Sequence, residues 1–280
     1  MPSGVLGKGR PTRITRVNIL NTLRKRRPLV KKKLWIFDFD NTLARLEPEV
    51  DWAGGRRELE PMLRGLGVPA DLFEQFPRGN LPLYAGMRTR LIELATNGSR
   101  EFTRARVRAI LREASAMIEK YEVAGVDRAA PLEGAIDLLR ALRTYGAQLA
   151  IVTSNSSRTI RRWVSPRRLN RSVDAIVGRD SLLALKPSPE MISRALMRCG
   201  VRAKDSAFVG DADSDYLAAA TLGMDFFGVA FSQNLRDKLA AAGAARIFSS
   251  PAALGIYLNL LDAAEIAAGD DAEARTPHRS

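Results

Sequence analysis

Apolar and polar positions follow two different periods along the second half of the chain. Short apolar runs that predict buried strands occupy residues 34–37, 148–153, 175–177, 207–209, 226–229 and 246–248. Apolar residues at helical spacing occupy the segments between and after the later runs, at 132–145, 157–169, 189–199, 214–222, 234–242 and 251–262. Strands that alternate with helices form parallel sheets covered by those helices. The pattern therefore predicts an α/β fold, with a Rossmann-like parallel sheet and helices on both of its faces.

Residues 45–130 have a different pattern, in which no convincing strand occurs. Helical spacing covers the ranges 56–66, 70–77, 81–97 and 100–122. In the last of these ranges, apolar side chains between Phe102 and Ile118 stand close to helical spacing. We interpret residues 45–130 as an inserted α-helical cap domain. The α/β core then comprises residues 34–44 and 131–263.

Positive charge is concentrated in a leader, residues 1–33. The leader holds 11 of the 44 basic residues and no acidic residue, whereas the chain as a whole has a net charge of +13. The rest of the chain keeps 33 basic and 31 acidic residues, so it is close to neutral. Because the basic character belongs to the leader, a nucleic-acid-binding fold does not follow from it.

Three interpretations of the leader stay open. The first is a flexible solvated tail, or a stretch translated from a start codon upstream of the native one. The second is a segment that contacts an acidic surface such as RNA or anionic lipid. The third interpretation is an organellar presequence, since the leader is basic and acid-free but lacks the apolar centre of a secretory signal. At the other end, residues 264–280 are polar and are predicted to form a frayed tail.

Scarce residue types restrict the possible chemistry. The only cysteine is Cys199, which excludes an internal disulfide and argues against a metal–thiolate site. The only histidine is His278, so a histidine base, nucleophile or zinc ligand is disfavoured. No apolar run is long enough to predict a membrane span. We therefore expect a cytoplasmic protein whose chemistry depends on carboxylates.

Two carboxylates, Asp38 and Asp40, follow the first predicted strand directly. The carboxyl ends of parallel strands are the places where open α/β sheets bind ligands. Strand alternation directs both side chains to the same side. Such a pair suggests a hard cation, a covalent nucleophile, or both.

Later strands and loops end in polar residues that complement this pair. They are Thr153, Ser154 and Asn155 after one strand, Lys186 before a helix, and Asp211 and Asp215 after another strand. Four carboxylates at one edge would repel one another unless a divalent cation lay among them, and oxygen ligands favour Mg²⁺ over zinc. Thr153, its neighbouring N–H groups and Lys186 offer donors to a phosphate group. This combination indicates phosphoryl transfer.

These stretches resemble, in order, the four motifs of the haloacid dehalogenase-like (HAD) superfamily of phosphohydrolases. The matching residues are Asp38-Phe-Asp40-Asn-Thr42-Leu, Thr153/Ser154, Lys186-Pro187 and Gly210-Asp211-Ala-Asp213-Ser-Asp215. The resemblance covers about residues 34–262. The helical insert and the stretches at 131–134 and 242–247 are similar to the phosphoglycolate phosphatase-like branch of the superfamily.

The resemblance implies a role for each candidate residue. Asp38 would attack phosphorus to form an aspartyl-phosphate, and Asp40 would protonate the leaving oxygen and then activate water. Lys186 and Thr153 would hold the phosphoryl group, and we expect Ser154 and Asn155 to bind substrate. The Mg²⁺ ligands would be the Asp38 carboxylate, the Asp40 main-chain carbonyl and Asp211, with Asp215 as a ligand or an orienting residue.

Two functional hypotheses follow. The first is a Mg²⁺-dependent phosphatase (a phosphoric monoester hydrolase) that removes phosphate from a small phosphorylated metabolite. The alternative is a nucleic-acid-associated phosphatase or interaction protein, docked through weak contacts of the leader with nucleic acid or another anionic surface. Within the superfamily, the resemblance favours hydrolysis, because dehalogenases and phosphonatases lack an acid at the position of Asp40.

Overall fold

The structure is a computed structural model that describes residues 29–263. Most of the predicted leader and the whole of the predicted tail therefore lie outside the described residues. Residues 29–33 do lie against the core. The Leu29 N–H donates to the Leu258 carbonyl at 2.9 Å, and Lys32 forms an ion pair of 2.8 Å with Asp225.

Six parallel strands form one sheet in the order β3-β2-β1-β4-β5-β6. The strands are β1 (Leu34–Phe37), β2 (Gln148–Val152), β3 (Ala175–Val177), β4 (Ser206–Gly210), β5 (Asp225–Val229) and β6 (Ile247–Phe248). Strand β1 lies inside the sheet, and its last residue, Phe37, is in register with Ile151 of β2 and Val209 of β4. Because all strands are parallel, the loops that follow β1, β2 and β4 meet at one edge.

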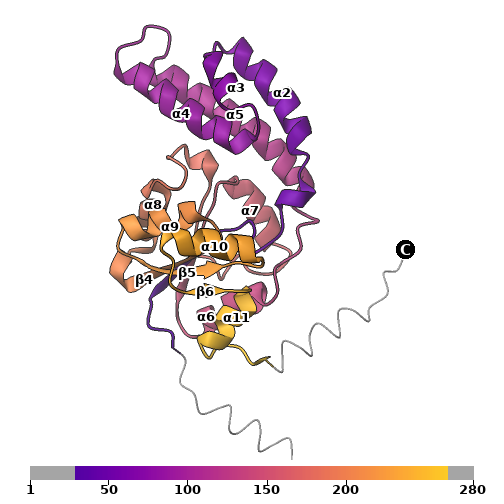
Figure 1. Ribbon diagram of the computed structural model, residues 1–280, viewed down its shortest axis with the longest axis vertical. Coiled ribbons are helices and arrows are strands. Elements are labelled where there is room, and N and C mark those ends of the chain that lie inside the picture. Colours follow the sequence, from indigo (N-terminus) through magenta and orange to yellow (C-terminus); the bar gives the residue numbers. More distant parts are fainter. Residues whose placement is uncertain (1–28, 264–280) are drawn as a thin grey trace, which may run out of the picture.

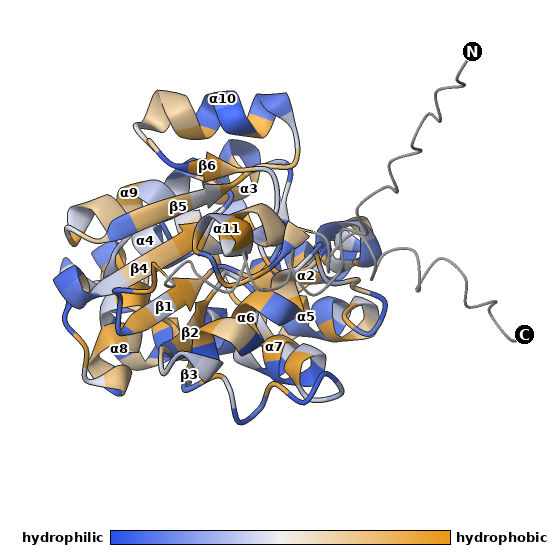
Figure 2. Cartoon of the chain, turned by 90° about the horizontal axis from the view of Figure 1, so that it is seen from below, coloured by the Kyte–Doolittle hydropathy of each residue, from blue (hydrophilic) through white to orange (hydrophobic). Residues whose placement is uncertain are grey.

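The side chains of β1 alternate between two apolar layers. Leu34 and Ile36 belong to the cluster formed with α8, α9 and α10, whereas Trp35 and Phe37 belong to the cluster with α6, α7 and α11. Figure 2 shows the hydrophobic strands lying between these helices. A strand buried on both faces needs an unbroken apolar run, which explains the sequence at 34–37. The helices are α6 (Ala135–Thr144), α7 (Ser157–Val164), α8 (Glu190–Cys199), α9 (Asp213–Thr221), α10 (Gln233–Ala242) and α11 (Pro251–Tyr257).

Four further helices lie between β1 and α6 in the chain and stand over the carboxyl edge of the sheet (Figure 1). Thr103 caps the N-terminus of the longest of them, α5 (Arg104–Gly125), where its hydroxyl accepts from the Arg106 N–H at 3.3 Å. Apolar side chains of this layer join the same cluster as α8 and α9, so the layer packs on the core. The helices are α2 (Trp52–Gly65), α3 (Asp71–Gln75), α4 (Asn80–Thr96) and α5 (Arg104–Gly125). Three 3₁₀ turns are η1 (Glu47–Glu49), η2 (Arg179–Ser181) and η3 (Ala203–Asp205).

The predicted α/β fold class is confirmed, and the differences lie at element ends. Helix α7 ends at Val164 rather than at 169, because Pro166 has no N–H with which to continue the helix. Helix α11 ends at Tyr257 rather than at 262, shortly before Asn259 adopts a φ of 56°. Among residues 29–263, no helix has both the length and the apolar character needed to cross a membrane.

Candidate active site

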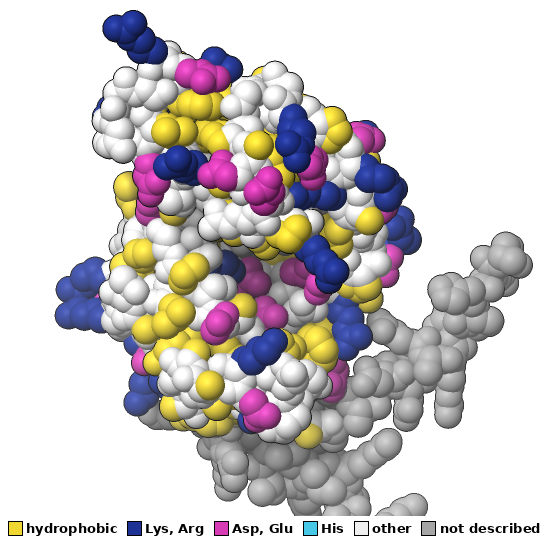
Figure 3. Space-filling view, turned by 45° about the horizontal axis from the view of Figure 1, so that its top comes forward, with side chains coloured by type: hydrophobic (Ala, Val, Ile, Leu, Met, Phe, Trp, Pro, Cys, Tyr) yellow, Lys and Arg dark blue, Asp and Glu magenta, His cyan; other side chains and the backbone are white. Residues whose placement is uncertain are grey.

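Three buried carboxylates meet at the carboxyl edge of the sheet. Asp38 follows β1 directly, and Asp211 and Asp215 follow the neighbouring strand β4. One carboxylate oxygen of each residue lies within 4.8 Å of those of the other two. Figure 3 shows acidic side chains inside a hollow between the layer of α2–α5 and the core. The structure thus brings together three of the carboxylates that the sequence singled out.

Lys186 reaches this cluster from the loop that follows β3. Its Nζ lies 2.6 Å from Asp38 Oδ1 and 2.5 Å from Asp215 Oδ1, and it also donates to the Val152 carbonyl at 3.3 Å. Burial alone would lower the pKa of Lys186, but the attraction of Asp215 and Asp38 raises it above its ordinary value. Lys186 therefore stays positively charged beside the carboxylates.

The positions of Asp211 and Asp215 are maintained by neighbouring groups. Thr42, in the loop after β1, donates to Asp211 Oδ1 at 3.3 Å. Asp215 Oδ2 accepts from the Ala212 N–H at 3.1 Å. Gly210 makes the second arrangement possible, because a Cβ atom at that position would collide with the Asp215 carboxylate. The glycine of the fourth motif is thus required for a close approach within the site.

Burial and mutual repulsion disfavour the ionised carboxylates. Burial raises the pKa of Asp211 to about 8, and repulsion from Asp38 and Asp215 adds to the shift. Burial likewise raises the pKa of Asp38 to about 7, although the attraction of Lys186 opposes this change. Three carboxylates facing one ammonium group leave an excess of negative charge when all are ionised.

The cluster fits a divalent cation. Its potential ligands are all carboxylate oxygens, the donors that hard cations such as Mg²⁺ prefer. A bound divalent cation would compensate the charge that Lys186 leaves unbalanced, and it would favour the ionised forms of Asp38 and Asp211. The residues that would hold it are Asp38, Asp211 and Asp215.

Asp40 lies outside this cluster, and its side chain is directed to other partners. Its Oδ1 accepts from the N–H groups of Leu46 and Glu47, at 2.9 and 3.1 Å, where the chain leaves the core for α2. Burial raises the pKa of Asp40 to about 6, against the opposite effect of those two hydrogen bonds. Its contribution to a metal site through the main-chain carbonyl stays a prediction.

The loop that follows β2 is held by hydrogen bonds within the protein. Thr153 Oγ1 donates to Asn155 Oδ1 at 3.0 Å and accepts from the Asn155 N–H at 3.2 Å. The Asn155 amide donates to Glu122 at 3.2 Å, and the Ser154 carbonyl accepts from Arg179 at 2.7 Å. The roles of Ser154 and Asn155 as substrate contacts stay predictions, and both residues belong to a network that connects α5 to the core.

Sequence reasoning missed the centre of that network, the ion pair of Glu122 and Arg179. The two side chains are 2.6 Å apart and both are 0% exposed. They stand 57 positions apart in the chain, so no local spacing links them. One signal was present: Glu122 follows Ile118 and Leu111 at helical spacing, which places a charge on the apolar face of α5.

Comparisons with known proteins agree with this geometry. The model of the family "Haloacid dehalogenase-like hydrolase" matches residues 80–229. Phosphoglycolate phosphatase 1 of Pseudomonas aeruginosa is 28% identical over 207 residues, which are 72% of this chain and 71% of that protein. The phosphoglycolate phosphatase of Pseudomonas fluorescens is 31% identical over 101 residues, or 36% of this chain and 37% of that protein.

Solved structures show the same fold at low sequence identity. A hydrolase from Pseudomonas syringae matches with a TM-score of 0.52 and 21% identity, covering 81% of this chain and 98% of that one. CbbY from Rhodobacter sphaeroides, in complex with xylulose-(1,5)bisphosphate, matches with a TM-score of 0.53 and 21% identity, covering 82% of this chain and 100% of that one. The chain therefore belongs to the haloacid dehalogenase-like hydrolases. The predicted resemblance to phosphoglycolate phosphatases and the prediction of a phosphatase-type enzyme are confirmed.

Proposed function

We propose that this protein is a Mg²⁺-dependent phosphatase that hydrolyses small phosphorylated metabolites through an aspartyl-phosphate on Asp38. The observation that carries the proposal is the convergence of Asp38, Lys186, Asp211 and Asp215 at the carboxyl edge of the sheet. The family to which the chain belongs supports the same chemistry.

Asp38 is suited to attack phosphorus. Lys186 contacts its Oδ1, which leaves Oδ2 to form the new bond to phosphorus. In the first step the Asp38–phosphorus bond forms while the bond from phosphorus to the leaving oxygen breaks. Water then cleaves the aspartyl-phosphate and regenerates the carboxylate.

Asp40 is our candidate for the general acid and base. Its pKa, raised by burial to about 6, lies near neutral pH, where proton transfer in both directions is effective. In this role Asp40 gives a proton to the leaving oxygen and then takes one from the attacking water. The hydrogen bonds from Leu46 and Glu47 occupy only one of its two oxygens.

The remaining residues would bind the phosphoryl group and the cation. The Lys186 ammonium and the hydroxyl and amide donors of the loop after β2 would contact phosphoryl oxygens. The predicted ligands Asp38, Asp211 and Asp215, with the Asp40 carbonyl, would hold Mg²⁺, which supplies electrostatic stabilisation of the transferring group.

The substrate we propose is a small phosphate monoester, and phosphoglycolate is the first compound to test because it appears in the names of the two relatives compared above. A cytoplasmic location, expected from the sequence, stays a prediction. The layer of α2–α5, standing over the site, would shield the reaction from bulk water and contact the leaving group.

The test is phosphate release from p-nitrophenyl phosphate and from phosphoglycolate, with and without Mg²⁺. Asp38→Asn should abolish Mg²⁺-dependent release. Asp213→Asn is the matched control, since this exposed carboxylate stands in the same motif, as the first residue of α9, and within residues 29–263 its one hydrogen bond comes from the neighbouring Ser214 N–H. Undiminished activity in Asp38→Asn, or equal loss in both variants, would contradict the proposal.

A further inference from the structure

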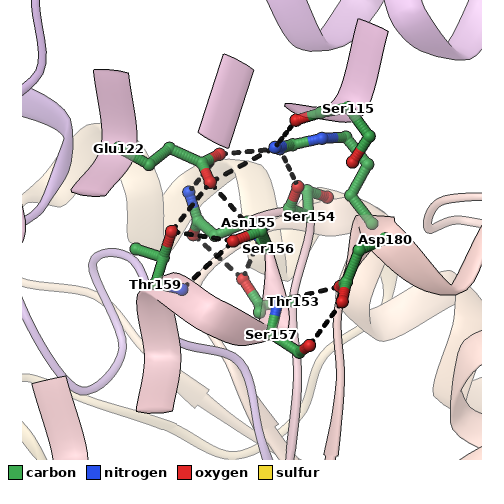
Figure 4. A network of polar contacts seen from close by, with 10 residues as sticks. Ser115, Glu122, Thr153, Ser154, Asn155, Ser156, Ser157, Thr159 and Asp180 are labelled. Carbon is green, nitrogen blue, oxygen red and sulfur yellow. Dashed lines mark hydrogen bonds and ion pairs between the residues drawn. The ribbon is translucent and has the colours of Figure 1, made fainter. Parts of the chain in front are cut away.

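The ion pair of Glu122 and Arg179 connects cap helix α5 to the core beside the candidate active site (Figure 4). Arg179 Nη1 donates to Glu122 Oε1 at 2.6 Å, and Nη2 donates to Oε2 at 3.2 Å. This two-pronged geometry fixes the direction of both side chains. Neither side chain is exposed to solvent. Burial of both charges is costly, and their mutual attraction offsets that cost only when hydrogen bonds satisfy the remaining polar atoms.

The remaining bonds of Glu122 go to the loop after β2 and to the first turn of α7. The Ser156 N–H donates to Oε2 at 2.9 Å, and the Thr159 hydroxyl donates to the same oxygen at 3.1 Å. The Asn155 amide donates to Oε1 at 3.2 Å. Asn155 in turn accepts from the Thr153 hydroxyl at 3.0 Å. Glu122 is thus connected through one side chain to the hydroxyl proposed to bind the phosphoryl group.

The remaining bonds of Arg179 go to the same loop and to α5. Its Nη1 also donates to the Ser154 carbonyl at 2.7 Å, and its Nη2 donates to the Ser115 carbonyl of α5 at 3.2 Å. The Arg179 main-chain N–H donates to the Asn155 carbonyl at 2.9 Å. This close approach requires Gly178, because a Cβ atom there would collide with the Asn155 carbonyl and the Ser157 amide.

Polar contacts between the cap helices and the core occur on the β2 and β3 side. Arg88 of α4 donates to the Leu182 carbonyl at 3.1 Å and to Glu190 at 3.3 Å. Arg158 of α7 contacts Glu119 of α5 at 3.3 Å. Within residues 29–263, no hydrogen bond or ion pair joins α2–α5 to the loops after β4 and β5. Of the contacts on the β2 and β3 side, the ion pair of Glu122 and Arg179 is fully buried and reaches the loop of Thr153.

We propose that Glu122 and Arg179 are positioning residues for the phosphoryl-binding loop, Thr153–Ser156, and that they keep this loop in register with cap helix α5. The proposal rests on the function proposed above. Glu122 fixes the Ser156 amide and the Asn155 side chain, and Arg179 fixes the Ser154 carbonyl, so the donors of the loop are oriented before substrate arrives. A displacement of about 1 Å in such a loop is enough to cost about a hundredfold in rate.

The experiment compares three variants of the full chain. Glu122→Gln keeps the shape and removes the charge, and it leaves Arg179 without its counter-ion. The double variant Glu122→Gln/Arg179→Met removes both charges, so that the folded state contains no unpaired buried charge at this position. The matched control is Glu119→Gln. Glu119 lies on α5, as Glu122 does, and its partly exposed carboxylate pairs with Arg158.

Each variant is measured in four ways: the thermal midpoint, kinetics on p-nitrophenyl phosphate with Mg²⁺, inhibition by inorganic phosphate, and hydrogen exchange of the peptide covering residues 153–157. We expect the double variant to regain most of the thermal stability that Glu122→Gln loses. Its kcat should nevertheless stay at least about tenfold below the wild-type value, with a smaller change in KM. Inhibition by inorganic phosphate should weaken in parallel, and residues 153–157 should exchange faster than in the control.

A purely structural ion pair predicts a different result, in which activity and phosphate inhibition return together with the thermal midpoint. That outcome, or unchanged exchange at residues 153–157 in the double variant, would overturn the proposal. The two proposals fail separately. A wild-type protein that releases no phosphate contradicts the proposed function, whereas hydrogen exchange still decides whether the pair positions the loop.

Discussion

Binding of Mg²⁺ at the carboxylate cluster should depend steeply on pH between 6 and 8. Burial raises the pKa of Asp38 to about 7 and that of Asp211 to about 8 in the metal-free protein. Both groups must lose their protons before they bind a cation, so binding competes with protonation. The population in which both are ionised grows on the order of 10²–10³-fold from pH 6 to pH 8. The apparent Kd for Mg²⁺ should fall by a similar factor.

The sign of the effect on stability follows from the same pKa values. Both carboxyls have pKa values above the ordinary 3.8, so the folded metal-free protein binds more protons than the unfolded chain between about pH 4 and pH 8. Its free energy of unfolding should therefore fall as pH rises from about 4 and level off once pH has passed 8. Stabilisation by a fixed Mg²⁺ concentration should increase over the same interval, because the metal binds the folded state.

Isothermal titration calorimetry at pH 6, 7 and 8 measures this directly. Repeating each titration in two buffers of different ionisation enthalpy counts the protons released, which should approach two at pH 6 and fall below one at pH 8. Asp213→Asn is the control and should keep the wild-type dependence. An affinity that changes less than about threefold across this range, or binding without proton release at pH 6, would refute the reasoning.

Four further substitutions test individual contacts. Thr42→Val removes the hydroxyl that donates to Asp211, and we expect titration to show a loss of Mg²⁺ affinity of about tenfold at an unchanged thermal midpoint; equal affinity would mean that this contact does not orient the ligand. Trp35→Phe removes a buried N–H that has no partner within residues 29–263, whereas Trp163→Phe removes one that donates to a carbonyl at 3.0 Å. Denaturant unfolding should therefore show the larger loss of unfolding free energy, about 2 kcal/mol, for Trp163→Phe. A larger loss for Trp35→Phe would contradict the stabilising role of the Trp163 hydrogen bond. Asp51→Ala removes the cap of α2 and should cost about 1 kcal/mol in free energy of unfolding, and no cost would show that the cap is dispensable.

The sheet and the carboxylate cluster could be predicted because their signals are local. An apolar run buried on two faces, such as Leu34–Phe37, has few alternatives to a central parallel strand. Once the strands are parallel, the residues and loops that follow them meet at one edge, which is why Asp38, Asp211 and the loop of Lys186 could be expected to gather. The order of the strands, with β1 between β2 and β4, supplied the actual neighbours.

The remaining features depend on contacts between distant segments. Nothing in the sequence near Glu122 indicates that its partner is Arg179, because their meeting depends on how α5 packs over the loop after β3. The role of Gly210 depends on a contact of the same kind, because its missing side chain makes room for the Asp215 carboxylate. Helix ends shifted where a proline or a left-handed residue ended the helix, as at Pro166 and Asn259.

The most direct test of the proposed mechanism is to search for the phosphorylated aspartate. Wild-type protein, Asp40→Asn and Asp38→Asn are each mixed with a phosphate monoester and Mg²⁺, quenched in acid during turnover, and mapped by peptide mass spectrometry. The mechanism predicts one added phosphoryl group on the peptide that contains Asp38 in the wild type and none in Asp38→Asn. With p-nitrophenyl phosphate, whose leaving group departs without a proton from Asp40, the phosphoryl group should be more abundant in Asp40→Asn, where hydrolysis lacks its base. Phosphate release without a phosphorylated Asp38, or a phosphoryl group on another residue, would contradict it.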